Sequence, residues 1–168
     1  MPLQRLLREW TDRLVQRGGA PDARQAGAIP YTVVKGQVVF LIITSRSSGR
    51  WIFPKGDPIE GLEPWESAAQ EALEEAGIEG EVDPRPIGAY RTMKTLAIRR
   101  AVIEVDMYPL RLTRQLDDWA EKKHRHRHWV ILPEARRLLS EPKLRELAER
   151  LNRRVLAEAQ PAMESIRR

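Results

Sequence analysis

Residues 64–77, PWESAAQEALEEAG, carry the clearest helix signal in the chain. Proline suits the first position of a helix and glycine suits the position just past its end, so the stretch predicts a helix over residues 64–76. At about 100° of rotation per residue, the tryptophan, leucine and alanine side chains fall on one apolar face. Three glutamates share the opposite face: Glu71, Glu74 and Glu75.

This acidic face carries two electrostatic costs. Like charges three or four residues apart on a helix repel by roughly 0.2–0.5 kcal/mol per pair. Glu74 and Glu75 also lie in the last turn, where the helix dipole disfavours an anion by about 0.3–1 kcal/mol. No lysine or arginine lies within the helix to relieve them. The face is either a solvated acidic surface or a site for a divalent cation, because hard cations bind clustered carboxylate oxygens.

Two glycines and three prolines punctuate the loop ahead of the helix, residues 54–64. Gly56 and Gly61 could let the backbone come close to a ligand or to another segment, or they could be ordinary turn residues. If the ligand is a cation, a carbonyl oxygen from this loop would complete its oxygen shell.

Outside this helix the chain shows further strand and helix patterns. The predicted strands are residues 28–34, 37–44, 51–53, 87–93, 98–108 and 126–132. The other predicted helices are residues 3–17, 133–139 and 142–159, and residues 115–127 are predicted to be a loop. This order predicts an α/β fold in which a mixed sheet lies between helices, preceded by an amphipathic N-terminal helix.

The chain divides, on this interpretation, into three parts. Residues 1–22 are an N-terminal helix and linker, residues 23–160 are the main domain, and residues 161–168 are a frayed C-terminal tail. A total of 168 residues suits one domain with a real core. The apolar stripe of the first helix would pack on that domain or on a second copy of the chain, which makes a homodimer an open alternative.

Composition narrows the classes of function. The chain has no cysteine, which excludes disulfides and thiolate metal sites and fits a cytoplasmic location. No apolar run approaches the roughly 20 residues that span a bilayer, so we expect no membrane partner. The net charge of +5 suits a polyanion, such as nucleic acid or a phosphorylated small molecule, or it is a basic surface that aids solubility.

Residues 56–78, GDPIEGLEPWESAAQEALEEAGI, resemble the signature of the Nudix hydrolase family, G-x5-E-x7-R-E-U-x-E-E-x-G-U, in which U is aliphatic. The matching residues are Gly56, Glu71, Glu74, Glu75, Gly77 and Ile78. Leu62 and Gln70 depart from the pattern, at the first glutamate and at the arginine. The PKG and GLEP motifs, Asp118-Trp119, Trp129 and residues 133–135 look more narrowly like the diphosphoinositol polyphosphate phosphohydrolase group, whose members also cleave diadenosine polyphosphates.

The resemblance implies a Nudix-type α/β/α sandwich and a magnesium-dependent hydrolase, with manganese as a substitute ion. Glu71 and Glu75 would bind the metal, Glu74 would be a third ligand or the base, and the Gly56 carbonyl would assist. These three glutamates would be the catalytic residues. In the family the signature arginine helps to orient a metal-binding glutamate, and Gln70 in its place can still donate a hydrogen bond. Glu121 is a candidate for a base outside the signature.

The implied substrate is the phosphoanhydride bond of a nucleoside- or inositol-linked polyphosphate, such as a diadenosine polyphosphate or a diphosphoinositol polyphosphate. One alternative is a hydrolase of ADP-ribose or nucleoside triphosphates on the same scaffold. Another is a module of impaired catalysis that binds a nucleotide or RNA, with Leu62 and Gln70 as marks of lost chemistry. A small-molecule partner is expected, and nucleic acid is not.

A polyphosphate needs cationic contacts, and arginine suits bidentate contact with phosphate. The candidate phosphate-binding residues are Lys55, Arg46, Arg50, Lys123, Arg125 and Arg127, with Arg91, Lys94, Arg99 and Arg100 as weaker candidates. If extended, residues 123, 125 and 127 would share one face and three histidines the other. The alternatives are a solvated loop for the basic residues and a zinc site for the histidines. Trp119 and Trp129 would either stack on a base or pack in the core.

Overall fold

The computed structural model describes residue 15 and residues 18–166. Its strands are β1 (Ala23–Val34), β2 (Gln37–Thr44), β3 (Trp51–Ile52), β4 (Lys55–Gly56), β5 (Ile78–Val82), β6 (Gly88–Thr95), β7 (Arg100–Gln115) and β8 (Arg127–Ile131). Its helices are α2 (Pro64–Ala76), α3 (Leu132–Leu138) and α4 (Pro142–Ile166). The predicted helix over residues 3–17 lies, apart from residue 15, outside the described residues.

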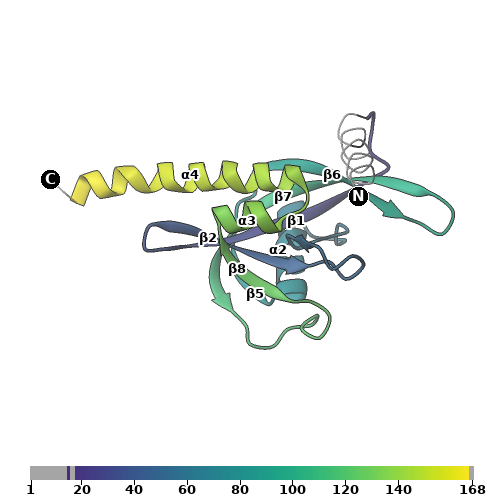
Figure 1. Cartoon of the computed structure of the whole chain (residues 1–168), viewed down its shortest axis with the longest axis horizontal. Helices are drawn as coiled ribbons and strands as arrows, with labels where there is room; N and C mark the ends of the chain where they lie inside the picture. The colour runs from purple at the N-terminus through teal and green to yellow at the C-terminus, as the bar shows by residue number, and fades with distance from the viewer. Residues whose placement is uncertain (1–14, 16–17, 167–168) are drawn as a thin grey trace.

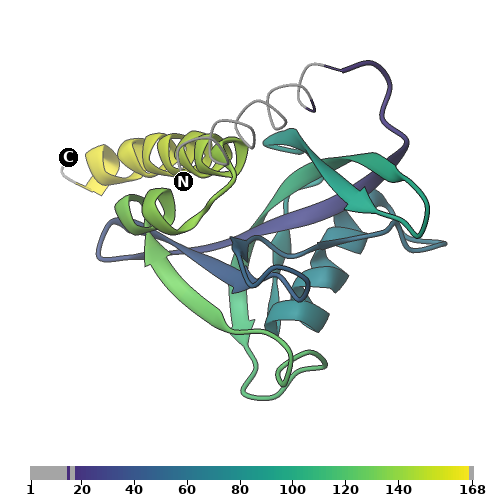
Figure 2. The same ribbon diagram turned by 45° about the vertical axis from the view of Figure 1, so that its right-hand side comes forward.

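The described strands form one mixed sheet. Its central order is β3-β2-β1-β7-β5, and β4, β6 and β8 pair with β1, β7 and β2 respectively. β1 and β7 run parallel, whereas the other pairs are antiparallel. In Figures 1 and 2, α2 lies on one side of this sheet, and α3 and α4 lie on the other. The predicted α/β fold, a mixed sheet between helices, is therefore confirmed.

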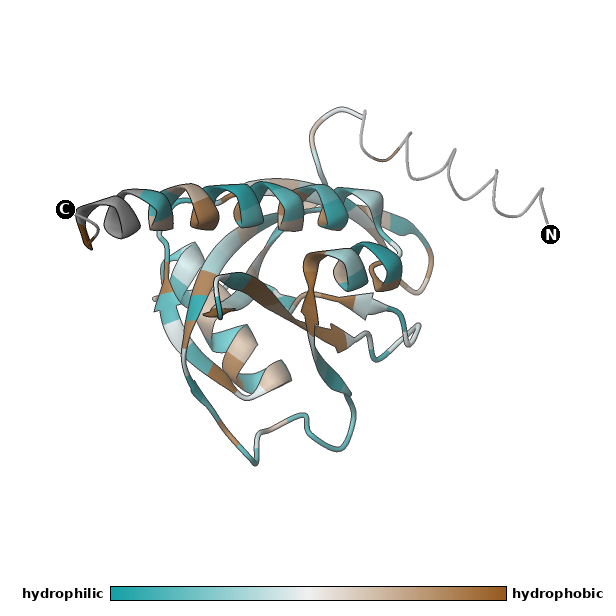
Figure 3. Ribbon diagram, turned by 60° about the vertical axis from the view of Figure 1, so that its left-hand side comes forward, coloured by the Kyte–Doolittle hydropathy of each residue, from teal (hydrophilic) through white to brown (hydrophobic). Residues whose placement is uncertain are grey.

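The core consists of two clusters, one on each face of the sheet. Successive residues of a strand point to opposite faces, so Phe40 and Ile42 join one cluster while Leu41 and Ile43 join the other. The first cluster meets leucines of α4, and the second meets the alanines of α2. Figure 3 shows that the central strands are hydrophobic and that hydrophobic and hydrophilic residues alternate along α4. No helix within the described residues is long and apolar enough to cross a membrane.

Helix α2 has the predicted bounds, and both of its ends are locally encoded. At the N-terminus the Glu63 N–H donates to the Glu66 carboxylate at 2.8 Å. Pro64 takes the first helical position, which needs no N–H donor. At the C-terminus Gly77 adopts the left-handed conformation with φ of 66°, which a glycine enters without steric cost. Sequence signals of this kind act within a few residues, so they predict the helix accurately.

Several predicted bounds are wrong. Strand β5 is not predicted by the sequence, because Glu79 and Glu81 make this short segment polar. It forms through its pairing with β7. The same pairing explains why β7 continues past its predicted end at residue 108 to Gln115. β4 lies in the predicted loop 54–64 and pairs with β1. α4 continues through Pro161 to Ile166, across the predicted start of a frayed tail, because the neighbouring alanine, glutamine and methionine residues favour a helix.

Candidate active site

The predicted glutamates lie where α2, β4 and the segment of residues 116–126 meet. β4 pairs with β1 in the register Gly27 with Lys55 and Ala26 with Gly56, which holds β4 beside α2. A Cβ atom added at Gly56 would stand 2.2 Å from the carboxyl carbon of Glu71. Glycine at position 56 therefore lets the β4 backbone touch Glu71. Among the roles that the sequence allows for Gly56, the structure thus shows a close approach of the backbone to another segment.

Glu75 is the most buried of the three glutamates, with 7% of its surface exposed. Its Oε1 accepts a hydrogen bond from Arg125 Nη2 at 2.7 Å, and its Oε2 accepts one from the Lys55 backbone N–H at 3.2 Å. Burial raises the pKa of Glu75 to about 7, although Arg125 and the Lys55 N–H oppose the rise. Neighbouring Glu71 and Glu121 add to it.

Glu71 and Glu74 complete the predicted set. Burial raises the pKa of Glu71, and repulsion by Glu74, Glu121 and Asp57 raises it further. Glu74 Oε1 accepts a hydrogen bond from Gln70 Nε2 at 2.7 Å. The glutamine that replaces the signature arginine thus still orients one carboxylate of the set. We define the acidic cluster as Glu71, Glu74, Glu75 and Glu121.

The acidic cluster can be tested as a site for a divalent cation. Within the part of the chain that the structure describes, no three histidine, cysteine, aspartate or glutamate side chains are arranged to hold a metal ion. The donors nonetheless suit a hard cation, because they are carboxylate oxygens. For Glu71 and Glu75, burial and repulsion by neighbouring carboxylates raise the pKa, so a bound cation would stabilise their charged forms. The residues that could hold such an ion are Glu71, Glu74, Glu75 and Glu121 with the Gly56 carbonyl, after a rotation of side chains.

Residues 116–127 cap the C-terminus of α2. Four donors from this segment reach the last carbonyl groups of the helix and of Gly77. They are the Glu121 N–H to Glu74 O, Trp119 Nε1 to Glu75 O, Arg127 Nη1 to Ala76 O and the Leu116 N–H to Gly77 O. Two arginines, Arg125 and Arg127, therefore stand at the negative end of the helix, where cations are favoured. They offset much of the electrostatic cost that the glutamates carry at this end of the helix.

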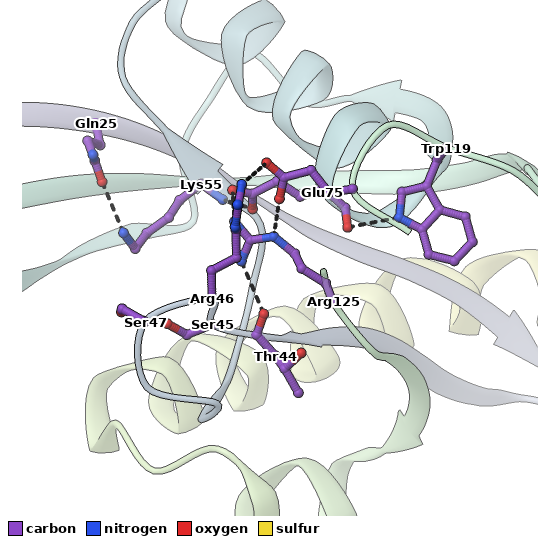
Figure 4. Close-up of polar contacts among 10 residues, drawn as sticks. Gln25, Thr44, Ser45, Arg46, Ser47, Lys55, Glu75, Trp119 and Arg125 are labelled. Carbon is purple, nitrogen blue, oxygen red and sulfur yellow. Dashed lines mark hydrogen bonds and ion pairs between the residues drawn. The ribbon is translucent and has the colours of Figure 1, made fainter. Parts of the chain in front are cut away.

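Lys55 lies on the other side of Glu75 and is held by a short polar chain (Figure 4). Its Nζ donates to Gln25 Oε1 at 3.1 Å, as Figure 4 shows. Gln25 Nε2 in turn donates to Asp57 Oδ1 at 3.0 Å. Burial lowers the pKa of Lys55, nearby Glu75 opposes this, and Lys94 of β6 adds to it. Gln25 and Asp57 were missed by sequence reasoning, because a glutamine in a strand and an aspartate in a loop carry no signal of their own.

Residues 116–126 form no strand, in agreement with the loop predicted over residues 115–127, so the basic face that an extended segment would have made is not formed. Residues 120–124 form turns, and β8 begins only at Arg127, so residues 123, 125 and 127 do not share the face of one strand. The segment has to turn in order to cap α2. Lys123 is exposed, Arg125 is ion-paired within the acidic cluster, and Arg127 contacts the end of α2.

The remaining predicted cations are at the edge of the site or beyond it. Arg46 is exposed, and its Nη1 lies 3.5 Å from Glu121 Oε1. Arg50 is also exposed and follows in the same loop. Lys94, a weaker candidate, is close enough to Lys55 to influence its pKa. The structure therefore brings Arg46 to Glu121 and Lys55 to Glu75 of the acidic cluster, and leaves Lys123 on the exposed turn.

His128 and the two tryptophans have protein contacts of their own. His128, one of the three histidines of the zinc alternative, faces Glu134 at 3.2 Å. The Trp119 ring lies against α2, with the Arg127 guanidinium carbon 3.9 Å from its centroid. Trp129 Nε1 donates to Gln115 Oε1 at 2.6 Å. Both tryptophans thus have structural contacts.

Comparisons with known proteins give the family. No family model matches the chain. Nudix hydrolase 21, chloroplastic, of Arabidopsis thaliana is 32% identical over 148 residues, which are 83% of this chain and 71% of that protein. Human diphosphoinositol polyphosphate phosphohydrolase 3-beta is 29% identical over 118 residues, 69% of this chain and 68% of that protein. The chain therefore belongs to the Nudix hydrolase family.

Solved structures agree on the fold. The binary complex of an Ap4A hydrolase from C. elegans matches with a TM-score of 0.60 and 19% identity, covering 80% of this chain and 98% of that chain. Across the Arabidopsis relatives compared, the chain spans 63% to 77% of the relative's own length. The family and the Nudix fold are thus shown, whereas substrate and site residues have to be argued from the geometry.

Proposed function

We propose that this chain hydrolyses a phosphoanhydride bond in a nucleoside- or inositol-linked polyphosphate, in the presence of Mg²⁺ or Mn²⁺. The observation that carries the proposal is the acidic cluster at the end of α2, together with half-buried Lys55, whose backbone N–H donates to Glu75 and whose ammonium donates to Gln25. Clustered carboxylates suit a hard cation, and a nearby ammonium suits the phosphate oxygens of a substrate.

Each residue of the site has a proposed role. Glu71 and Glu75 are metal ligands, Glu74 is a third ligand or the base, and the Gly56 carbonyl assists. Glu121 is a second candidate for the base, because it faces both Glu71 and Glu75. A bound dication would neutralise charge on the phosphate chain and lower the pKa of the attacking water.

Lys55, Lys94 and Arg46 are proposed to bind substrate phosphates. Arg50 and Lys123 stay predictions for a longer phosphate chain, because both are exposed near the site's edge or beyond it. Arg125 and Arg127 are better explained by their contacts with α2. The substrate class is supported by the human relative, named for diphosphoinositol polyphosphates, and by the Ap4A hydrolase that shares the fold.

ADP-ribose is a second candidate substrate, because a solved Nudix domain of Shewanella oneidensis NrtR, complexed with ADP ribose, has the same fold with a TM-score of 0.62. A binding module without catalysis is disfavoured, because Gln70 still holds Glu74 and the acidic cluster is assembled. Release of phosphate or nucleotide from a diadenosine polyphosphate, a diphosphoinositol polyphosphate, ADP-ribose and nucleoside triphosphates, each with and without Mg²⁺, tests the proposal. Absence of metal-dependent turnover on all four would contradict it.

The remaining predictions concern the whole chain. A cytoplasmic location and the division at residues 22/23 and 160/161 stay predictions. So does a homodimer formed through the apolar stripe of residues 3–17.

Replacing Lys55 with methionine is expected to lower kcat/KM by roughly 10–100-fold, mainly through a higher KM, because a charge-assisted bond to phosphate is lost. Stability should change by less than about 1 kcal/mol, because removing an ammonium whose charge burial disfavours offsets the loss of its hydrogen bond to Gln25. Steady-state kinetics and thermal denaturation measure both effects. Lys143→Met on α4, which removes a surface pair with Glu146, is the matched control and should behave like wild type. An unchanged KM in Lys55→Met would remove Lys55 from the substrate site.

A further inference from the structure

Arg125 is fixed in the acidic cluster by all three of its guanidinium nitrogens (Figure 4). Nε donates to Glu121, Nη1 donates to the Thr44 carbonyl at 3.1 Å, and Nη2 donates to Glu75 at 2.7 Å. Its side chain is only 9% exposed. Because all three nitrogens are bonded to the protein, Arg125 is poorly placed to bind a substrate. Its role therefore has to lie in the groups to which it donates.

The backbone around Arg125 is fixed as well. The Arg125 N–H donates to Glu121 O at 3.1 Å, and the His126 N–H donates to Thr44 Oγ1 at 2.9 Å. The Thr44 N–H in turn donates to His126 O at 3.0 Å. The Arg125 guanidinium thus reaches α2 from a segment that is hydrogen-bonded to the end of β2. Its position does not depend on the side chain alone.

Glu75 is the residue that this arrangement positions. One of its oxygens faces Arg125 and the other faces the Lys55 N–H, so the plane of the carboxylate is set from two sides. Gln70 cannot provide the first contact while it donates to Glu74. The place of the signature arginine on α2 is therefore taken by an amide that serves a different glutamate.

We propose that Arg125 is a positioning residue for Glu75, and that it supplies from the loop the guanidinium which the family signature places at position 70. This inference rests on the proposed function, because it assigns Glu75 to the metal site. It differs from a second explanation, in which Arg125 is a counter-ion that competes with the metal. The two explanations predict opposite changes in metal affinity when the guanidinium is removed.

The experiment compares Arg125→Gln and Arg125→Lys with Arg136→Gln, a control that breaks an ion pair with Glu149 away from the site. Mn²⁺ affinity is measured by titration calorimetry, and kcat and KM are measured with the best substrate of the panel. We expect Arg125→Gln to lower kcat and weaken Mn²⁺ binding by roughly 10–100-fold each, with little change in KM. Arg125→Lys, which keeps the charge and leaves the buried glutamates paired, should fall between wild type and Arg125→Gln.

Three results would overturn the assignment. Tighter Mn²⁺ binding in Arg125→Gln would show that the arginine competes with the metal. A rise in KM alone would show that it binds substrate. Unchanged kcat and Mn²⁺ affinity in Arg125→Lys and Arg125→Gln, with only a lower melting temperature, would show a purely structural role. If the wild-type protein itself takes up no Mn²⁺, the proposed function fails and this inference fails with it.

Discussion

Replacing Glu75 with glutamine is expected to reduce kcat by roughly 10²–10⁴-fold, the range typical for loss of a group that acts directly on the reaction. Glutamine has the same shape but no negative charge, and its amide offers one acceptor oxygen where the carboxylate has two. A metal ligand would therefore be lost while the packing at the end of α2 is kept.

The same substitution should leave the fold almost intact. Burial raises the pKa of Glu75 to about 7, so the folded protein already disfavours its charge. The glutamine NH2 would meet either the Arg125 guanidinium or the Lys55 N–H, which are both donors, so one of the two bonds would be lost at a cost of about 1–3 kcal/mol. Urea denaturation without metal measures this cost, and steady-state kinetics measure turnover. Glu79→Gln on β5, which loses only an exposed pair with Arg114, is the control. Undiminished turnover in Glu75→Gln would refute the metal role.

Replacing Gly56 with alanine is the second substitution with a large expected effect. The new Cβ would stand 2.2 Å from the Glu71 carboxyl carbon, whereas carbon atoms rest at roughly 3.5–4.0 Å. Gly56 has no positive φ, so alanine fits its backbone. The strain should be relieved by moving the Glu71 carboxylate, which is the far end of a flexible side chain.

A displacement of about 1 Å at a reacting group can lower turnover by about 10²-fold, which is the loss we expect for Gly56→Ala. Stability should fall by about 1–3 kcal/mol, the range for overpacking, because Glu71 is half-buried and only the end of its side chain can move. Gly19→Ala is the control, since nothing lies within 4 Å of a Cβ at that position. Normal kcat in Gly56→Ala would mean that Glu71 has no fixed place in the reaction.

Local signals account for the parts of the fold that sequence predicts well. Pro64 and Gly77 delimit α2, and the spacing of its glutamates places them on one face. Strand β2 contains an unbroken apolar run, residues 38–43, and such a run is typical of a strand that is buried on both faces, as β2 is. Strand β5 has no such signal, because its place depends on β7, more than twenty residues further along the chain.

The candidate site also consists of a part that local sequence signals predict and a part that they do not. Glu71, Glu74 and Glu75 share one helix, so their neighbourhood is visible in the sequence. Arg125 is fifty residues from Glu75, and the predicted loop that carries it gives no signal of where its side chains lie. Arg125 and Arg127 also supply positive charge at the end of α2. The unfavourable placement of the glutamates therefore does not by itself demand a metal, and the case depends on the arrangement of the donors.

The central claim is that the acidic cluster binds a divalent cation, and crystals soaked in Mn²⁺ test it most directly. We predict anomalous density for at least one ion in contact with the Glu71 and Glu75 carboxylates, together with Mn²⁺ uptake in solution that Glu75→Gln loses. Crystals with no density at these carboxylates, and a calorimetric titration of the wild-type protein without heat of binding, would contradict the account.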